Sequence, residues 1–342
     1  MKKINKNATL ELFELADQGK YDTNDLEKIK ILLSEGADPN FCQKDYPNET
    51  VLYRVVSSWE DKNRLEVVKM LLTFGVDFNQ KSDIFYPIEK AVFNNDFALV
   101  QFMLENGADQ GLDYSLKSAI EKNNIDLVTL LLKYNINLNE FEPYAKSYLI
   151  FSCEAYRIRD KSTLYETQPE IAIAKLLIHH GIDVNGLNHE ESPILEAIRH
   201  NFYDLVELLL ENGAVLSTEV RASIWVNTPE MFQFLVEKGI IKDLNEIIFP
   251  REQTPLMHHI IQSNFDIAKY LIENNANLYH TDKHKKTAFH YAVYTENSAF
   301  IDYLLDYFDV KKCHEISSVL DGTDNKNIIN KLKAILDTTI LN

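Results

Sequence analysis

The chain has 342 residues, of which 45% are hydrophobic and 25% are charged, a composition typical of a folded protein and too apolar for a disordered one. Its 52 acidic and 35 basic residues give a net charge of −17, which argues against nucleic-acid or anionic-membrane partners, because both bind positive surfaces. Three distant cysteines, Cys42, Cys153 and Cys313, favour a reducing compartment over a disulfide framework. No apolar run reaches the roughly 18 residues of a membrane helix, and the basic N-terminus lacks the apolar core of a signal peptide. We therefore expect a cytoplasmic protein without a membrane span.

A short phrase recurs along the chain: two aliphatic residues, two variable residues, and then Gly or a substitute for it. From the first end at Gly36 to the ninth at Phe308, the phrase advances 272 residues in eight steps, a period of about 34. A fixed period of this length is the mark of a repeat array. In chain order the phrase ends at Gly36, Gly75, Gly107, Asn135, Gly181, Gly213, Gly239, Asn275 and Phe308.

In four of the units a second phrase falls 21 residues before the first phrase ends. It is Ser192-Pro193 before Gly213, and Thr254-Pro255 before Asn275. A Ser or Thr hydroxyl can cap the first amides of a helix, and Pro fits the first helical position. Residues 204–211 then form a broad apolar helix face, and Gly213 supplies the left-handed residue that ends this helix. Each repeat is predicted to be a helix–turn–helix.

The turn between the two predicted helices contains Asn in four repeats, at Asn95, Asn123, Asn201 and Asn227. After Gly, Asn is the residue that best tolerates a left-handed backbone, so the column indicates a tight turn. One such unit cannot bury its apolar face alone. Stacked neighbours bury it together, so stability is distributed along the array.

These motifs resemble the ankyrin repeat family. Thr287-x-x-His290-x-Ala292 matches its Thr-Pro-Leu-His-x-Ala motif at three positions, and Gly-Ala-Asp at 36–38 and 107–109 matches the end of its second helix. The resemblance implies an all-α solenoid of about nine helix–turn–helix repeats, with short hairpin loops and a helical cap at both ends. Lys-, Asn- and Ile-rich usage and an eroded consensus are similar to ankyrin proteins of bacteria and large viruses. We expect the array at 1–310 and a C-terminal helical cap at 311–342, with repeats ending near 40, 79, 111, 139, 185, 217, 243, 279 and 310.

Two repeats carry insertions. One adds about four residues around Trp59, and the other adds about thirteen at 156–168. In repeat proteins such insertions form loops on one face, often the binding face. A tolerated surface excursion explains them equally well, because long loops cost little entropy.

The sequence contains none of the common catalytic motifs: no P-loop, no dinucleotide fingerprint, no His-Glu-x-x-His and no nucleophile elbow. The adjacent pairs His179-His180 and His258-His259 point about 100° apart on a helix, so neither makes a joint ligand set. In the family, His290 ties neighbouring repeats together. We therefore expect no enzymatic activity, no cofactor and no metal.

The resemblance implies that the protein binds a partner protein through a concave face of inner helices and hairpin tips. Trp225, Phe93 and Tyr294 share one column there, and exposed aromatic residues commonly anchor interfaces. The alternative is that these aromatic side chains fold back onto neighbouring repeats. The candidate partner-binding residues are Trp59, Phe85, Phe93, Asn94, Glu121, Lys122, Arg199, His200, Trp225, Ile261, Gln262, Lys283, Lys286, Tyr294 and Thr295.

The predicted role is that of an adaptor, a host-directed effector or a stoichiometric inhibitor, monomeric without its partner and located in the cytoplasm or delivered into a host cytosol. The acidic charge favours a basic partner protein. Two other functions stay open. One is an immunity or antitoxin protein that neutralises a basic toxin, and the other is an enzyme with a cryptic site in the 156–168 insertion or the C-terminal segment.

Overall fold

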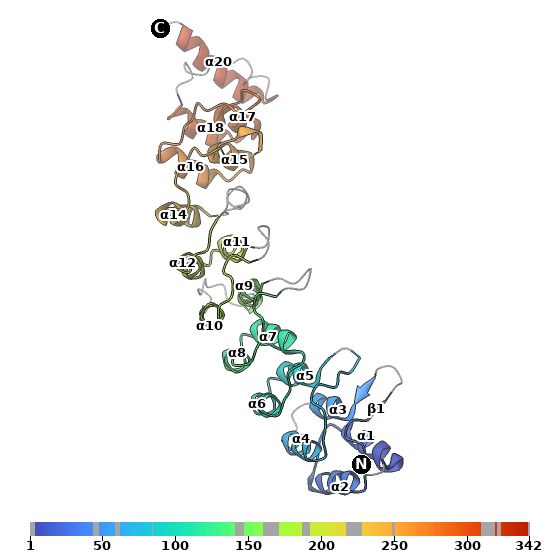
Figure 1. The fold of residues 1–342 in the computed structure, drawn as a ribbon. Coiled ribbons are helices and arrows are strands. Elements are labelled where there is room, and N and C mark those ends of the chain that lie inside the picture. Colours follow the sequence, from blue (N-terminus) through green and yellow to red (C-terminus); the bar gives the residue numbers. More distant parts are fainter. Residues whose placement is uncertain are drawn as a thin grey trace. The chain divides into compact units, whose positions relative to one another are not determined.

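The computed structural model describes residues 4–43, 48–58, 62–83, 85–140, 147–159, 171–186, 192–216, 228–247, 250–308, 319 and 323–340. Eighteen α-helices lie in this described part. The only strands there are two strands of two residues each, which pair with one another. The chain divides into two compact units, residues 1–184 and residues 185–342, and each is described by itself (Figure 1). The predicted all-α fold class is confirmed.

In the first unit, helices follow one another in pairs (Figure 1). The first helices of successive pairs pack side by side, from α1 through α3, α5 and α7 to α9, and α2 packs on α4, α6 on α8 and α8 on α10. Strand β1 (Cys42–Gln43) pairs antiparallel with β2 (Glu49–Thr50) before α3. The helices are α1 (Lys6–Ala16), α2 (Thr23–Ser34), α3 (Val51–Ser57), α4 (Arg64–Thr73), α5 (Pro87–Phe93), α6 (Phe97–Glu105), α7 (Leu112–Glu121), α8 (Ile125–Leu131), α9 (Tyr148–Arg159) and α10 (Ala172–His179).

The second unit repeats this pairing. Helix α11 packs on α12, α15 on both α16 and α17, and α17 on α18. Helix α20 lies near the C-terminus, inside the segment proposed as a helical cap. The elements are α11 (Pro193–Arg199), α12 (Tyr203–Glu211), α14 (Pro229–Glu237), the 3-10 turn η3 (Pro250–Glu252), α15 (Pro255–Ile261), α16 (Phe265–Glu273), α17 (Ala288–Tyr294), α18 (Ser298–Leu305) and α20 (Lys326–Ile340).

The predicted left-handed turns between paired helices are confirmed at three of the four asparagines. Asn95, Asn123 and Asn201 have φ of 56°, 51° and 57°, while Asn227 lies outside the described residues. In other repeats Ser263 and Glu296 adopt the same conformation, with φ of 60° and 54°. The turn is therefore imposed by the helix pair, and it holds residues that would not reveal it in the sequence.

The ends of the second helices follow the predicted pattern with two exceptions, Asn135 and Phe308. Gly213 has φ of 88° and Asn275 has φ of 63°, so both adopt the left-handed conformation that ends a helix. Asn135 is not among the residues with positive φ. Helix α8 instead ends at Leu131, and the chain turns through a bond from the Ile136 amide to the Tyr134 carbonyl oxygen, 2.8 Å long.

The first helices begin with two kinds of cap. The Thr254 hydroxyl accepts from the Met257 amide at 3.4 Å, as predicted. The same prediction for Ser192 is wrong: its hydroxyl makes no capping bond, and the preset backbone of the following proline begins that helix. At α17, His290 Nδ1 instead accepts from the Thr287 amide at 3.0 Å. This bond gives a partner to an amide donor that has none within the helix.

A row of asparagine side chains links neighbouring repeats and was not anticipated from the sequence. Asn79 Nδ2 donates to the Gly107 carbonyl at 2.9 Å, and Asn79 Oδ1 accepts from the Asp109 amide at 3.0 Å. Asn40 and Asn139 make the same pair of bonds to the next repeat, at 2.7–3.0 Å. Each amide thus satisfies one donor and one acceptor where a helix has just ended.

The core between the helices is apolar. Cys153 is fully buried in α9, as expected for a small hydrophobe. Within the described residues, every helix is too short or too polar to cross a bilayer.

Candidate functional site

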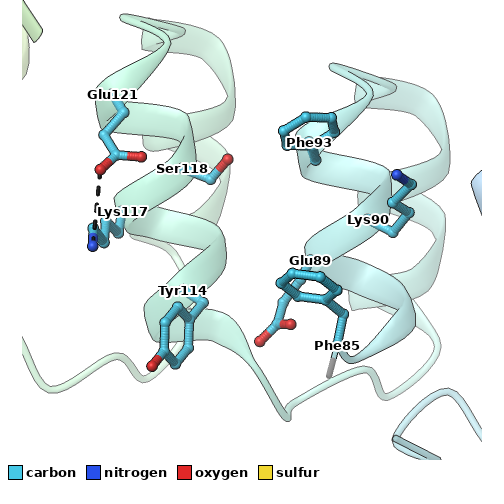
Figure 2. Close-up of a pocket in the computed structure, with 8 residues that line it drawn as sticks. All are labelled: Phe85, Glu89, Lys90, Phe93, Tyr114, Lys117, Ser118 and Glu121. Atoms are coloured by element: carbon cyan, nitrogen blue, oxygen red, sulfur yellow. Dashed lines mark ion pairs between the residues drawn. The ribbon is translucent and has the colours of Figure 1, made fainter. Parts of the chain in front are cut away.

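A groove of about 290 Å³ lies between α5 and α7 on the exposed side of the first helices, which we call the inner-helix face. Figure 2 shows the two helices side by side, with aromatic, basic and acidic side chains projecting from both. The lining residues are Phe85, Glu89, Lys90, Phe93, Tyr114, Lys117, Ser118 and Glu121.

A capping carboxylate of α5 and the glycine before α7 approach each other closely at the groove. Glu89 Oε2 accepts from the Tyr86 amide at 3.0 Å and so caps the start of α5. Gly111 precedes α7 with φ of 77°, and a Cβ at this position would lie 2.7 Å from Glu89 Oε1 and 2.8 Å from Tyr86 Cδ2. Glycine is required here both for the left-handed backbone and for the close approach.

Large aromatic side chains face solvent along the groove. Phe85 is 43% exposed, Phe93 is 50% exposed and Tyr114 is 64% exposed. Burial of apolar surface lowers the free energy by about 25 cal/mol per Å². An exposed cluster of this kind therefore favours association with a partner.

Two lysines lie on the Phe93 ring. Lys122 Nζ is 3.9 Å from the ring centroid and Lys90 Nζ is 4.9 Å from it. Lys122 Nζ also donates to the Phe93 carbonyl oxygen. Burial, and secondarily the charge of Lys90, lowers the pKa of Lys122 below the ordinary lysine value. The ring thus holds two cations close together.

Lys117 extends the groove toward α9. Its Nζ lies 4.4 Å from the centroid of the Phe151 ring and 3.9 Å from Glu121 Oε1, the ion pair drawn in Figure 2. Glu89 is the buried carboxylate of the groove. Burial raises its pKa, while the Tyr86 amide and the charge of Lys81 act in the opposite direction.

The groove brings together four of the predicted site residues. Phe85, Phe93 and Glu121 line it, and Lys122 stacks on Phe93. Asn94 has a structural contact instead: its Nδ2 donates to the Val56 carbonyl at 3.0 Å and links α5 to α3. Trp59 lies outside the described residues.

The predicted residues of the second unit lie at three places: on α11, at the end of α15 and around α17. Arg199 Nη1 and His200 Nε2 both contact Glu196, at 3.0 and 3.3 Å, on α11. Ile261 is 38% exposed at the end of α15, beside the exposed Gln262. Trp225, which the sequence placed in the same face, lies outside the described residues.

The remaining predicted residues surround α17. Lys286 Nζ donates to the Tyr294 hydroxyl at 2.7 Å and lies 4.4 Å from the ring centroid. Tyr294 is 41% exposed, Lys283 is exposed, and the Thr295 hydroxyl donates to the Ala292 carbonyl at 2.7 Å. This corner offers one aromatic surface next to a lysine, on a smaller scale than the α5–α7 groove.

A polar network supports the hairpin beside Tyr294. The Tyr291 hydroxyl donates to Asp282 Oδ2 at 2.5 Å and accepts from Gln253 Nε2 at 3.0 Å. Burial and the bond to Asp282 raise the pKa of Tyr291 to about 12. The network holds the hairpin in position.

Five residues of the groove were not predicted from the sequence: Glu89, Lys90, Tyr114, Lys117 and Ser118. A usable signal was present, because these residues lie three, four or seven positions before Phe93 or Glu121 and so share their helix face. Within the described residues, no three His, Cys, Asp or Glu side chains are placed to hold a metal ion. What the groove can do is stack on apolar groups and pair with charged ones.

Paired helices stacked in two rows, linked by asparagine side chains and ended by left-handed glycines, define an α-helical repeat protein. The family profile described as "Ankyrin repeats (3 copies)" matches residues 20–114 and 220–314, more than half of the chain. The chain belongs to the ankyrin repeat family, whose members are generally protein–protein interaction modules.

Similar proteins come from viruses and bacteria. An ankyrin repeat protein of Acanthamoeba polyphaga mimivirus is 22% identical over 89% of this chain and 37% of its own length. One from Fowlpox virus is 24% identical over 85% of this chain and 46% of its own length. The solved ankyrin repeat domain of Acinetobacter baumannii is 22% identical, with a TM-score of 0.49 over 60% of this chain and 98% of that one. The chain thus spans less than half the length of the two viral relatives.

Proposed function

We propose that this chain binds a partner protein through its inner-helix face and has no catalytic activity of its own. The observation that supports this proposal best is the α5–α7 groove, where Phe85, Phe93 and Tyr114 are each more than two fifths exposed. Aromatic residues supply much of the binding energy at interfaces when a partner covers them. The alternative, in which the aromatic column folds back on neighbouring repeats, does not agree with the exposure of Phe93 and Tyr294, while Trp225 lies outside the described residues.

In this role the chain acts as an adaptor, a host-directed effector or a stoichiometric inhibitor. Sparse cysteines fit a reducing cytoplasm, whether that of the producing cell or that of a host. Similarity to proteins of two viruses supports a role inside an infected cell. The proposed array occupies residues 1–310, the helical cap occupies 311–342, and the chain is a monomer in the absence of its partner.

An immunity or antitoxin role is the second candidate, and the net charge of −17 favours it. An acidic array attracts a basic toxin over long range and can then occlude it. Co-expression with a toxin encoded beside this gene would restore growth if this role holds. The rival enzyme site at 156–168 lies where no side chain is described.

Titration calorimetry with a purified partner tests the proposal. Phe93→Ala should weaken binding by about 2 kcal/mol or more, since it removes an anchor at the centre of the groove, and should leave helicity unchanged. Trp225→Ala should do the same if its column extends the face. Phe74→Ala is the matched control, because Phe74 is also exposed (36%) but follows α4, a second helix. Equal affinities for wild type and Phe93→Ala would reject the inner-helix face as the binding surface.

A further inference from the structure

Among the described residues, the two lysines on Phe93 have no anionic partner. Lys69 and Lys117 pair with carboxylates of their own helices, at 2.7 and 3.9 Å. In the described part of the chain, Lys90 and Lys122 form no ion pair, and both ammonium groups lie against the same ring. Although the chain has a net charge of −17, the described residues provide no carboxylate that pairs with either ammonium group on this ring.

The arrangement carries an electrostatic cost. Lys122 is half-buried, and burial together with Lys90 lowers its pKa. An anion bound next to either ammonium group would offset both the desolvation and the repulsion. The backbone carbonyl of Phe93 already accepts one proton of Lys122, which fixes the direction of the remaining donors.

An apolar pocket adjoins this cation pair. The cavity of about 290 Å³ beside Phe85, Phe93 and Tyr114 is close to the lower limit of small-molecule sites, roughly 300 Å³. It therefore has room for one apolar side chain of a partner. Figure 2 shows Phe93 and Lys90 on the same helix, so an anion and an apolar group would bind within one turn of each other.

The other charges of the groove select a carboxylate over a phosphate. Glu89 and Glu121 line the same cavity and would repel a dianion more strongly than a single negative charge. Phosphate is recognised best by the bidentate fork of arginine, and both cations on the Phe93 ring are lysines.

We propose that the α5–α7 groove binds an acidic–apolar segment of the partner protein, with an Asp or Glu carboxylate held by the lysines on Phe93, Lys90 and Lys122, and a neighbouring apolar side chain in the Phe85–Phe93–Tyr114 pocket. This inference rests on the proposed function, because it names the segment that the inner-helix face recognises. It agrees with a basic partner, since net charge acts on long-range attraction while the contacts in the groove fix specificity.

A phage-displayed library of random dodecapeptides, selected on the full chain, provides the probe. The selected peptides should be enriched in Asp or Glu within two positions of an aromatic or large aliphatic residue. Fluorescence anisotropy should show about tenfold or greater loss of affinity for the Lys90→Gln, Lys122→Gln double variant. Lys69→Gln removes a lysine of α4 and should bind like the wild type. Added salt should weaken binding to the wild type more than to the double variant.

The outcomes separate the inference from the proposed function. Peptides that lose affinity with Phe93→Ala but carry no acidic residue would overturn the inference and leave the inner-helix face intact. Peptides that bind equally to Phe93→Ala would contradict both. Tighter binding when phosphoserine replaces the acidic residue would overturn the carboxylate assignment, and a selection that yields no binder would overturn the inference. A charge-swapped peptide that binds Lys90→Glu, Lys122→Glu, and not the wild type, would support it even if the double variant loses some stability.

Discussion

The asparagine links between repeats predict how stability is distributed in the array. Asn79→Ala should destabilise the first unit. Among the contacts described, the side-chain amide of Asn79 makes every bond from this residue to the next repeat. Nδ2 donates to the Gly107 carbonyl at 2.9 Å, and Oδ1 accepts from the Asp109 and Gln110 amides at 3.0 and 3.2 Å. The substitution removes all three bonds while the backbone turn can persist.

The magnitude follows from the number of bonds. A hydrogen bond contributes about 0.5–1.5 kcal/mol net, and the two bonds to Oδ1 share one acceptor. Two equivalents give about 1–3 kcal/mol, and solvent access to the link favours the lower half of that range. Asn106→Ala is the matched control. Asn106 Nδ2 bonds only to the Phe102 carbonyl of its own helix, at 2.8 Å, so its loss should cost about 0.5 kcal/mol or less.

Urea denaturation followed by circular dichroism measures the free energy of unfolding of both variants. Hydrogen exchange locates the effect. The Asp109 amide should exchange faster in Asn79→Ala than in the wild type, and its exchange rate should be unchanged in Asn106→Ala. Equal destabilisation by the two substitutions would refute the claim that these side chains link the repeats. An unchanged Asp109 exchange rate would do so as well.

Three further predictions concern the core, a turn and a buried histidine. Leu209→Ala removes a fully buried side chain of α12 and should lower the free energy of unfolding by about 2–5 kcal/mol; a urea midpoint that does not move would mean that the repeat frame is wrong. Asn123→Ala should lower stability by about 1 kcal/mol and Asn123→Gly by only a few tenths, because φ is 51°, and equal thermal midpoints would argue against strain there. Burial, and then the charge of His258, lowers the pKa of His259 to about 3, so its contribution to stability is complete above pH 6.5 and is lost as the pH falls toward 3. His259→Leu should reduce this loss in urea titrations at about pH 7 and pH 4.5; an identical pH dependence would contradict it.

The sequence was most informative where a local rule governs a single residue. Gly213 and Asn123 adopt the left-handed backbone because a helix must end or turn there, and only small or amide side chains do so easily. Ser263 and Glu296 adopt it too, but their residue types carry no such preference. The period predicts a turn in every repeat, but it did not identify these two residues as left-handed.

The candidate site was predictable only in part, because the position of a residue within the repeat does not show which side chains of other helices it contacts. Phe93 and Glu121 were expected on the exposed face and lie there. The cation pair depends on how closely α5 approaches α7, which Gly111 permits and no periodicity reveals. Asn94 shows the converse, since its place in the column did not disclose its bond to the Val56 carbonyl.

Site-specific photocrosslinking tests the central claim, that a partner binds on the inner-helix face, most directly. A benzophenone amino acid would replace Tyr114, which is exposed on α7, and in a second variant Gln101, which is exposed on the second helix α6. Illumination of each full-length variant with its partner should give a covalent adduct from position 114 and none from position 101. Adducts of equal yield from both positions, or from position 101 alone, would contradict the account.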